Sequence, residues 1–367
     1  MKLTVQRENL LKPLQAVSGV VERRQTLPIL SNVLIDCRGQ GQVTLTTTDL
    51  EVELMAGLDV GEGEVGRVTV PARKLFDICR ALPEASQLHI VSEEERVVVR
   101  TGKSRFTLST LPADDFPIVE DLREKNEVEI PQSALKGLME KTAFSMAQQD
   151  VRYYLNGLMV ETETGMLRAV ASDGHRLAVC ELSADIVVPE ARQVIVPRKG
   201  VLELMRLLEA EDKPARVEFG SNHIRVTTEA FRFTSKLIDG KFPDYQKVIP
   251  EREGGKIFAG RDLLRNALLR TAILSNEKYR GVRLDIGSER LRIQAQNPEL
   301  EEAEEEVEVQ YDGPAMEIGF NVNYLVDALG VIGEDDVIVK VTDQNSSCLI
   351  QAKSSDRCRY VVMPMHL

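Results

Sequence analysis

The feature that most constrains the fold of this chain is a unit of domain size that recurs three times in tandem. A polar turn residue marks the same point of each copy, at Asp49, Asp173 and Asn297, with a spacing of 124 residues each time. Asp and Asn suit such turns because their side chains bond the local backbone and tolerate a left-handed φ. Ordered recurrence at a constant spacing indicates a threefold repeat.

Each copy contains the same segments in the same order. A helix, a loop and a strand come first, then two strands around the polar turn, then a strand that enters a second helix, and finally a closing strand. The second helix of each copy is predicted to start with Pro71, Pro197 or Asn321, because proline is tolerated in the first helical turn. We therefore predict an α+β fold of three tandem domains. The predicted domains are 1–122, 129–250 and 254–367, with charged linkers near Asp121–Glu127 and Pro250–Gly255.

The five cysteines lie too far apart in sequence for a C-x-x-C site, and their number is odd. A disulfide framework is therefore not expected, and we interpret them as small buried hydrophobic residues of a reducing cytosol. The N-terminal apolar run is broken by charges, and no stretch approaches 18 apolar residues, so neither a signal peptide nor a membrane span is expected. The cysteines are Cys37, Cys79, Cys180, Cys348 and Cys358.

Charge is distributed unevenly along the chain. The net charge is −12, which taken alone argues against a nucleic-acid partner. The six predicted helices nevertheless sum to about +6, so the remaining residues carry about −18. These helices are predicted at Glu8–Ser18, Pro71–Leu82, Pro131–Gln149, Arg198–Leu208, Arg261–Ala272 and Asn321–Gly330. Lys and Arg are good helix formers, which explains a single basic helix. Helices that share one basic surface would instead bind the phosphates of a polyanion without reading its sequence.

No motif for catalysis stands out. The sequence has no nucleotide-binding glycine loop and no nucleophile elbow, and its histidines lack metal-ligand spacing. Ser172, Asp173 and His175 place a hydroxyl, a carboxylate and an imidazole together, but neighbouring turn residues point apart, and the repeat explains them as a strand turn. A metal-dependent hydrolase that uses Asp173, His175 and the glutamate run at 299–306 is one alternative, and a protein-only scaffold is another. We expect no cofactor and no metal.

The two ends of the chain carry opposite charges. The first copy has basic residues around an exposed-looking strand, whereas the third has the glutamate run and an apolar pair. Such ends suit a head-to-tail contact, and head-to-tail contacts close into rings when the rotation allows it. The residues predicted for this contact are Lys74, Arg96, Lys103, Arg105, Phe106, Leu108, Ile273, Leu274, Glu299, Glu301 and Glu302.

Several stretches resemble one known family over the whole chain. The sequence is similar to the beta subunit of bacterial DNA polymerase III, the sliding clamp, and most of all to its gamma-proteobacterial members. The stretches that carry the resemblance are TLPIL at Thr26–Leu30, SMAQQDVRYYLNG at Ser145–Gly157, SDGHRLAV at Ser172–Val179, IVPRKG at Ile195–Gly200, FTSKL, DGKFPDY, LSNEKYRGVRL and the terminal YVVMPMHL.

The resemblance implies a non-catalytic, cytoplasmic homodimer. Its two three-domain arcs would join head to tail into a ring, with helices around a central hole and antiparallel sheets outside. Duplex DNA would thread the hole without sequence specificity, a clamp loader would open the ring, and the ring would tether the polymerase III alpha subunit and other polymerases. Matching positions for DNA contact are Arg24, Arg73, Gln149, Tyr153, Tyr154 and Lys199.

The resemblance also implies an apolar cleft for a short partner peptide. A Met-rich, proline-containing chain terminus suits it, because such side chains make an adaptable apolar wall. Gln246, Lys247, Asn345 and Glu22 depart from the family pattern. The matching cleft residues are Arg152, Leu155, Ser172, Gly174, His175, Arg176, Leu177, Pro243, Val248, Asn321, Tyr324, Ser347, Val361, Met363, Pro364 and Met365.

Overall fold

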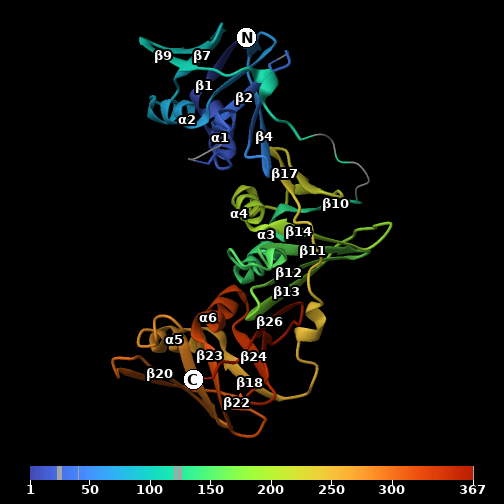
Figure 1. Ribbon diagram of the computed structural model, residues 1–367, viewed down its shortest axis with the longest axis vertical. Helices are drawn as coiled ribbons and strands as arrows, with labels where there is room; N and C mark the ends of the chain where they lie inside the picture. The colour runs from blue at the N-terminus through green and yellow to red at the C-terminus, as the bar shows by residue number, and fades with distance from the viewer. Residues whose placement is uncertain (23–26, 40, 120–121, 123–125, 367) are drawn as a thin grey trace. The chain divides into compact units, whose positions relative to one another are not determined.

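The computed structural model describes residues 1–22, 27–39, 41–119, 122 and 126–366 (Figure 1). The chain divides into two compact units, each assembled from two separate segments. The first unit comprises Met1–Ser133 and Leu202–Leu237, and the second comprises Ala134–Val201 and Ile238–Leu367.

The first unit contains two antiparallel sheets. A five-stranded sheet has the order β5-β1-β7-β8-β9, and an eight-stranded sheet has the order β10-β15-β16-β17-β4-β3-β2-β6. The strands are β1 Lys2–Gln6, β2 Asn32–Cys37, β3 Gln42–Thr48, β4 Val52–Asp59, β5 Glu62–Gly63, β6 Gly66–Pro71, β7 Gln87–Glu93, β8 Arg96–Thr101, β9 Ser104–Ser109, β10 Asn126–Pro131, β15 Pro214–Phe219, β16 His223–Thr227 and β17 Phe231–Lys236.

The second unit also contains two antiparallel sheets. A nine-stranded sheet has the order β14-β11-β12-β13-β26-β25-β24-β18-β22, and a four-stranded sheet has the order β21-β20-β19-β23. The strands are β11 Gly157–Glu163, β12 Met166–Ser172, β13 Arg176–Ser183, β14 Arg192–Pro197, β18 Gly255–Gly260, β19 Gly281–Ile286, β20 Arg290–Gln296, β21 Glu302–Glu308, β22 Gln310–Tyr311, β23 Met316–Asn321, β24 Asp336–Val341, β25 Cys348–Ala352 and β26 Cys358–Val362.

Four of the helices pack as two pairs on the sheets. In the first unit α1 packs against α2 and against β4, and in the second α5 packs against α6 (Figure 1). Each buries one apolar stripe, such as Leu10, Leu14 and Val17 of α1. The helices are α1 Arg7–Ser18, α2 Ala72–Ala81, α3 Gln132–Glu140, α4 Arg198–Leu207, α5 Arg261–Ala272 and α6 Val322–Val331.

Three predicted boundaries were wrong. The first helix of the second copy was expected to reach Gln149, but α3 ends at Glu140 and the chain continues through a turn and a short 3-10 helix, Ala143–Ser145. Pro71 and Pro197 precede their helices instead of occupying the first turn, because each still belongs to the preceding strand. The linker expected up to Glu127 ends earlier, because β10 starts at Asn126 and pairs with β15. Asp121 lies outside the described residues.

The polar turns of the first two copies have the same hydrogen bonds. The Asp49 carboxylate accepts from the backbone N–H of Glu51 and Val52, and the Asp173 carboxylate accepts from His175 and Arg176 in the same way. In the third copy the side-chain oxygen of Asn297 accepts from the N–H of Glu301, because the loop is one residue longer. The turns predicted at these positions are confirmed.

The large sheets run continuously from one copy of the repeat into the next. β4, the strand after the first polar turn, pairs with β17, the closing strand of the second copy. β13, the strand after the second turn, pairs with β26, the closing strand of the third copy. This continuity is why the two compact units do not coincide with the three copies of the repeat.

Two of the cysteines were wrongly predicted to be free. Cys180 of β13 and Cys358 of β26 form a disulfide, with their Cα atoms 4.1 Å apart. The pairing register places them directly opposite each other, although 178 residues separate them in the sequence. Sequence spacing carries no information about such a pair. Cys37, Cys79 and Cys348 are free and buried, as expected. Among the described residues, no helix is both long and apolar enough to span a membrane.

Candidate partner cleft and nucleic-acid surface

The second unit has an apolar cleft where β13 and β26 meet the segment at 242–248. Its volume is about 210 Å³. The floor is apolar because Leu155, Leu177 and Val361 are buried side chains of adjacent elements, and Met363, which is 38% exposed, forms one rim. The cleft is lined by Arg152, Tyr154, Leu155, Ser172, Gly174, Arg176, Leu177, Phe242, Pro243, Tyr245, Val248, Val361 and Met363.

Arg152 and Gly174 close one end of the cleft. Gly174 has a φ of 89°, and a β-carbon there would lie 2.6 Å from the Arg152 guanidinium. Arg152 Nη2 donates to the carbonyl of Asp173 at 3.3 Å, which holds the guanidinium over the turn. Glycine is needed here because it adopts the left-handed conformation and leaves room for the arginine.

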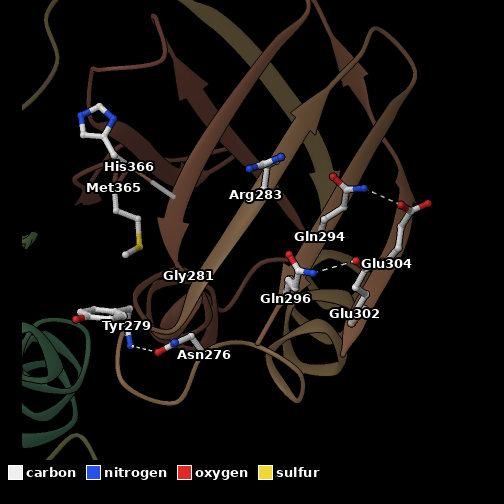
Figure 2. Close-up of a pocket in the computed structure, with 12 residues that line it drawn as sticks. Asn276, Tyr279, Gly281, Arg283, Gln294, Gln296, Glu302, Glu304, Met365 and His366 are labelled. Atoms are coloured by element: carbon white, nitrogen blue, oxygen red, sulfur yellow. Dashed lines mark hydrogen bonds between the residues drawn. The ribbon is translucent and has the colours of Figure 1, made fainter. Parts of the chain in front are cut away.

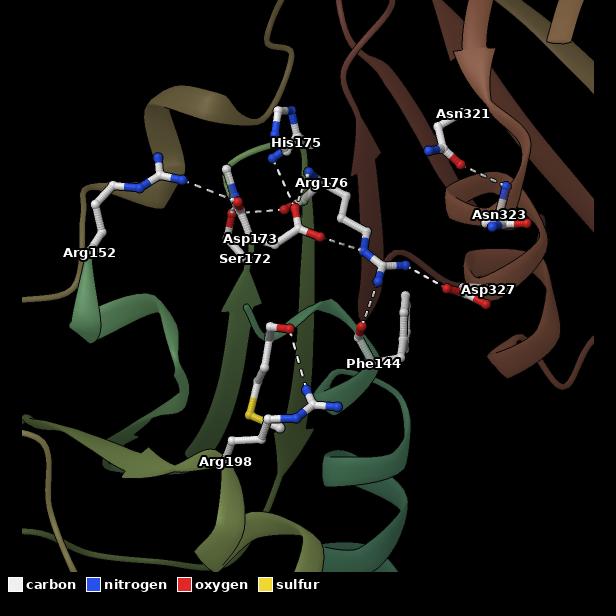
Figure 3. Close-up of polar contacts among 12 residues, drawn as sticks. Phe144, Arg152, Ser172, Asp173, His175, Arg176, Arg198, Asn321, Asn323 and Asp327 are labelled. Carbon is white, nitrogen blue, oxygen red and sulfur yellow. Dashed lines mark hydrogen bonds and ion pairs between the residues drawn. The ribbon is translucent and has the colours of Figure 1, made fainter. Parts of the chain in front are cut away.

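Arg176 joins the polar turn to the third copy of the repeat (Figure 3). Its guanidinium donates to the Asp173 carboxylate at 3.0 Å, to Asp327 of α6 at 2.6 Å and to the carbonyl of Phe144 at 2.8 Å. The guanidinium also lies over the ring of Tyr324, 4.5 Å from its centroid. All three nitrogens of this side chain therefore donate hydrogen bonds. Arg176 lines the cleft and links the polar turn to α6.

Six predicted cleft residues lie outside this cavity. The carbonyl of His175 accepts a hydrogen bond from the N–H of Met363, but the residue itself is exposed and does not line the cavity. Asn321 caps α6 and accepts from the N–H of Asn323 at 3.0 Å, and Tyr324 packs beneath Arg176. Met365 lines a separate cavity. Ser347 and Pro364, the remaining two, are half-buried.

Three aromatic residues that line the cleft were not predicted to do so. Tyr154 was predicted only as a DNA contact, and Phe242 and Tyr245 were not assigned to any site. The recurrence of Phe-Pro at 116–117 and 242–243 was a usable signal, because it marks the same crossing segment in two copies. Tyr245 is buried, and its hydroxyl donates to Glu161 at 3.4 Å beneath the cleft.

The residues predicted for DNA contact occupy different elements. Gln149 and Tyr153 lie together on one exposed loop; Gln149 has a φ of 57° and Tyr153 is 57% exposed. The loop is held by Asp150, which accepts from Arg152 at 2.9 Å and exchanges two hydrogen bonds with Asn156. Arg73 is exposed on α2 and donates to the Val21 carbonyl at 2.8 Å. Tyr154 and Lys199 are half-buried, and Arg24 lies outside the described residues.

Several basic helix residues have structural partners. Arg270 of α5 is paired with Glu305 at 2.6 Å, and Arg206 of α4 with Glu203 at 3.0 Å. Arg198 donates to the Met146 carbonyl at 3.4 Å. The structural explanation for basic helices therefore accounts for part of their charge, and Lys74 of α2 remains exposed.

Four of the residues predicted for the head-to-tail contact lie on two edge strands, and the others lie on helix α2, on strand β8 or in turns and loops. Arg105, Phe106 and Leu108 belong to β9, an edge strand of the first unit, and Glu302 belongs to β21, an edge strand of the second. Ile273 is 74% exposed at the end of α5, and Leu274 is half-buried. Lys74, Arg96, Lys103, Glu299 and Glu301 are exposed.

The strands, the repeated helix pairs and the cleft define a protein of the clamp class, and comparisons with known proteins agree. Models of the N-terminal, central and C-terminal domains of the DNA polymerase III beta subunit match residues 1–120, 129–244 and 246–366. The beta sliding clamps of Pseudomonas aeruginosa and Escherichia coli are 57% and 54% identical, each with full coverage of both chains. A crystal structure of the Pseudomonas aeruginosa subunit is 56% identical with a TM-score of 0.97 over the full length of both chains, and one from Caulobacter crescentus is 38% identical with a TM-score of 0.93.

The chain therefore belongs to the family of DNA polymerase III beta subunits, the beta sliding clamps. Family membership also settles the question of catalysis, because these are non-catalytic accessory subunits of the polymerase. The hydrolase alternative is thereby rejected. In the structure Asp173 bonds turn amides and Arg176, as the repeat predicts.

Proposed function

We propose that this chain is a processivity factor: two copies close head to tail into a ring that encircles duplex DNA and tethers the replicative polymerase. Helices line the hole and sheets face outward. Each chain of the dimer contributes three clamp domains, at 1–122, 129–250 and 254–367. The polymerase III alpha subunit, other polymerases and the clamp loader are the proposed partners, and the ring works in the cytoplasm.

The observation that carries this proposal is the pairing at the junctions between copies of the repeat. The strand after the polar turn pairs with the next closing strand twice, as β4 with β17 and as β13 with β26. The third such strand, β21, and the first closing strand, β9, are both sheet edges. An open edge presents unpaired backbone groups that favour pairing with another chain. If β21 of one chain pairs with β9 of a second chain, the same junction forms between the two chains. Two such junctions close a ring of two chains.

The repeat also gives the register of this pairing. Met55, Val179 and Glu304 occupy the same position, because they pair with Thr46, Val170 and Gln294. Met55 pairs with Arg232 and Val179 with Arg359, and the matching residue of β9 is Arg105. Arg105 of one copy therefore faces Glu304 of the other, a favourable cross-strand pair of opposite charges.

Charge supports the threading of DNA. The net charges of α1, α2, α3, α4, α5 and α6 are +1, +2, 0, +2, +2 and −1, whereas the whole chain carries −12. A modest basic surface binds phosphates weakly and without sequence preference, which permits sliding. Gln149 and Tyr153 add polar and aromatic contacts from one exposed loop.

The cleft supports peptide tethering. Its apolar floor of Leu155, Leu177 and Val361 suits leucine or phenylalanine side chains, and Met363 is a flexible rim that adapts to different peptides. His175, Asn321, Tyr324, Ser347 and Pro364 stay assigned to the surface around this cleft, whereas Met365 is reassigned to the separate cavity that it lines.

Topological retention tests the proposal. The ring, once loaded by a clamp loader onto nicked circular DNA, should stay bound through gel filtration and be released when the DNA is linearised. Equal retention on linear and circular DNA would exclude threading. A chain that sediments as a monomer at high concentration would exclude the ring itself and leave the scaffold alternative.

A further inference from the structure

A second cavity, larger than the cleft, lies on the four-stranded sheet of the second unit (Figure 2). Its volume is about 620 Å³. The floor is the outward face of β19, β20 and β21, where Gln296 pairs with Glu302 and Gly281 lies at the start of β19. Tyr279 and Met365 stand on one side and Glu302 and Glu304 on the other. The site assigned to partner peptides above does not use this floor.

The repeat identifies this cavity as the counterpart of the cleft. Gly157 and Gly281 are equivalent, because they pair with Pro197 and Asn321 at the start of equivalent helices. Two residues earlier, Tyr279 therefore takes the place of Leu155. Across the polar turn, the same alignment puts Gln296 at the position of Ser172 and Glu302 at that of Leu177. Each of these three residues lines the cavity, as its equivalent lines the cleft.

The counterpart lacks one wall in a single chain. In the cleft, the closing strand β26 and the residues after it supply Val361 and Met363. The equivalent closing strand beside β21 is β9 of a second chain. In the register derived above, Thr107 and Ser109 of β9 take the positions of Val361 and Met363. The contact between two chains thus forms a polar site, whereas the contact between β13 and β26 within one chain forms an apolar one.

Glu302 determines which ligand this site suits. Its carboxylate accepts a hydrogen bond of 3.1 Å from the neutral amide of Gln296, and in the dimer it faces the uncharged Thr107. Glu304 faces Arg105 instead. Arg283, the basic residue of the floor, has its Nε 3.4 Å from Glu317, which is not part of the lining. The Glu302 side of the cavity therefore keeps a negative charge, across the floor from the Tyr279 ring.

We propose that the junction between two copies forms a second docking site, which binds an extended peptide through a basic side chain placed between Tyr279 and Glu302. The ring of Tyr279 and the thioether of Met365 contact the methylene stem, and Glu302 binds the charged end. Because the second copy completes the site, it exists only in the closed ring. This inference rests on the proposed head-to-tail dimer.

The test uses a fluorescein-labelled Gly-Lys-Gly-Lys-Gly peptide and its Gln-substituted analogue, titrated with the full chain at low ionic strength. Anisotropy should show binding of the lysine peptide alone. Glu302→Gln should weaken it about tenfold, since a charged hydrogen bond is lost. Glu308→Gln, which removes the same charge from the same strand outside the cavity, should have no effect. Equal weakening by both variants would overturn the proposal.

Sedimentation separates failure of this site from failure of the dimer. Wild-type chain that is dimeric but does not bind the lysine peptide refutes the site and leaves the ring intact. Arg105→Glu should yield monomers that do not bind the peptide, and monomers that bind as tightly as the dimer refute the dependence on ring closure. If Glu302→Gln itself dissociates the dimer, Tyr279→Ala decides instead, because Tyr279 lies off the paired strand and its loss should weaken binding in an intact dimer.

Discussion

The guanidinium of Arg176 lies 4.5 Å from the ring centroid of Tyr324 and 2.6 Å from a carboxylate oxygen of Asp327, so one side chain ties the second polar turn to α6. Only 13% of the Arg176 side chain is exposed. The guanidinium is therefore largely desolvated. Its partners come within reach because the third repeat packs against the second.

Replacing Arg176 should destabilise the chain. Arg176→Met removes the donor to Oδ2 of Asp173 and to the Phe144 carbonyl. It should lower the free energy of unfolding by about 2–3 kcal/mol, less than the loss of a fully buried pair, because Asp327 is partly exposed. Arg176→Lys keeps the charge but loses the planar fork, and should cost less than the Met variant. Chemical denaturation measures both, and an unchanged midpoint for Arg176→Met would contradict the bracing role.

The disulfide should contribute to stability. The double variant Cys180→Ala, Cys358→Ala should unfold with a free energy about 2–4 kcal/mol lower than the wild type in the absence of reductant. Reductant should destabilise the wild type and leave the variant unchanged. Alkylation of the unreduced, denatured chain should label only Cys37, Cys79 and Cys348, and labelling of all five cysteines would show that the bond is absent.

The loop that carries Gln149 should keep its conformation in acid. Hydrogen bonds from Arg152 lower the pKa of Asp150 from 3.8 to about 2. A carboxylate with a depressed pKa stabilises the fold above its unfolded value and loses that contribution as the pH falls from about 3.8 through about 2. Carbon-detected NMR titration should show this low midpoint, and Arg152→Ala should raise it towards 3.8. An Asp150 midpoint near 3.8 in the wild type would show that Arg152 does not hold the loop through Asp150.

Two neighbouring methionines should affect peptide binding differently. Met363 lines the apolar cleft and Met365 lines the cavity on the four-stranded sheet. Met363→Ala should weaken a leucine- and phenylalanine-containing partner peptide by roughly tenfold, which corresponds to the burial of one apolar side chain at a binding surface. Met365→Ala is the matched control and should leave that affinity within about twofold. Isothermal titration with dimeric protein distinguishes them, and equal losses would place the cleft boundary elsewhere.

DNA binding should depend on salt and on the exposed loop in separable ways. Arg73→Ala should reduce the dependence of affinity on salt concentration, because one phosphate contact per copy is lost. Tyr153→Ala should weaken binding while leaving the salt dependence unchanged, because a ring stacks and does not displace counterions. Both are measured on short duplexes over a range of salt. A smaller salt slope for Tyr153→Ala would indicate that its effect is indirect.

Much of the architecture could be read from local patterns. Asp49 and Asp173 predicted equivalent turns, because the turn depends on a side chain bonding amides two and three residues away. The apolar spacing of the helices and the alternation of the strands are equally local. The family resemblance then supplied the cleft, but it placed Tyr154 only at the DNA surface, whereas the structure also places it in the cleft wall.

The sequence by itself determined the threefold repeat, because a recurrence at a spacing of 124 residues is visible without a structure. It also determined the α+β class, the polar turns and the excess of basic charge on the helices, because each of these depends on residues a few positions apart. Only the tertiary structure decided that β13 pairs with β26, that Cys180 meets Cys358, and that Arg176 binds Asp327. These contacts join segments 151 to 178 residues apart. Their register is set by how the strands of different copies pack together, and no local pattern encodes it.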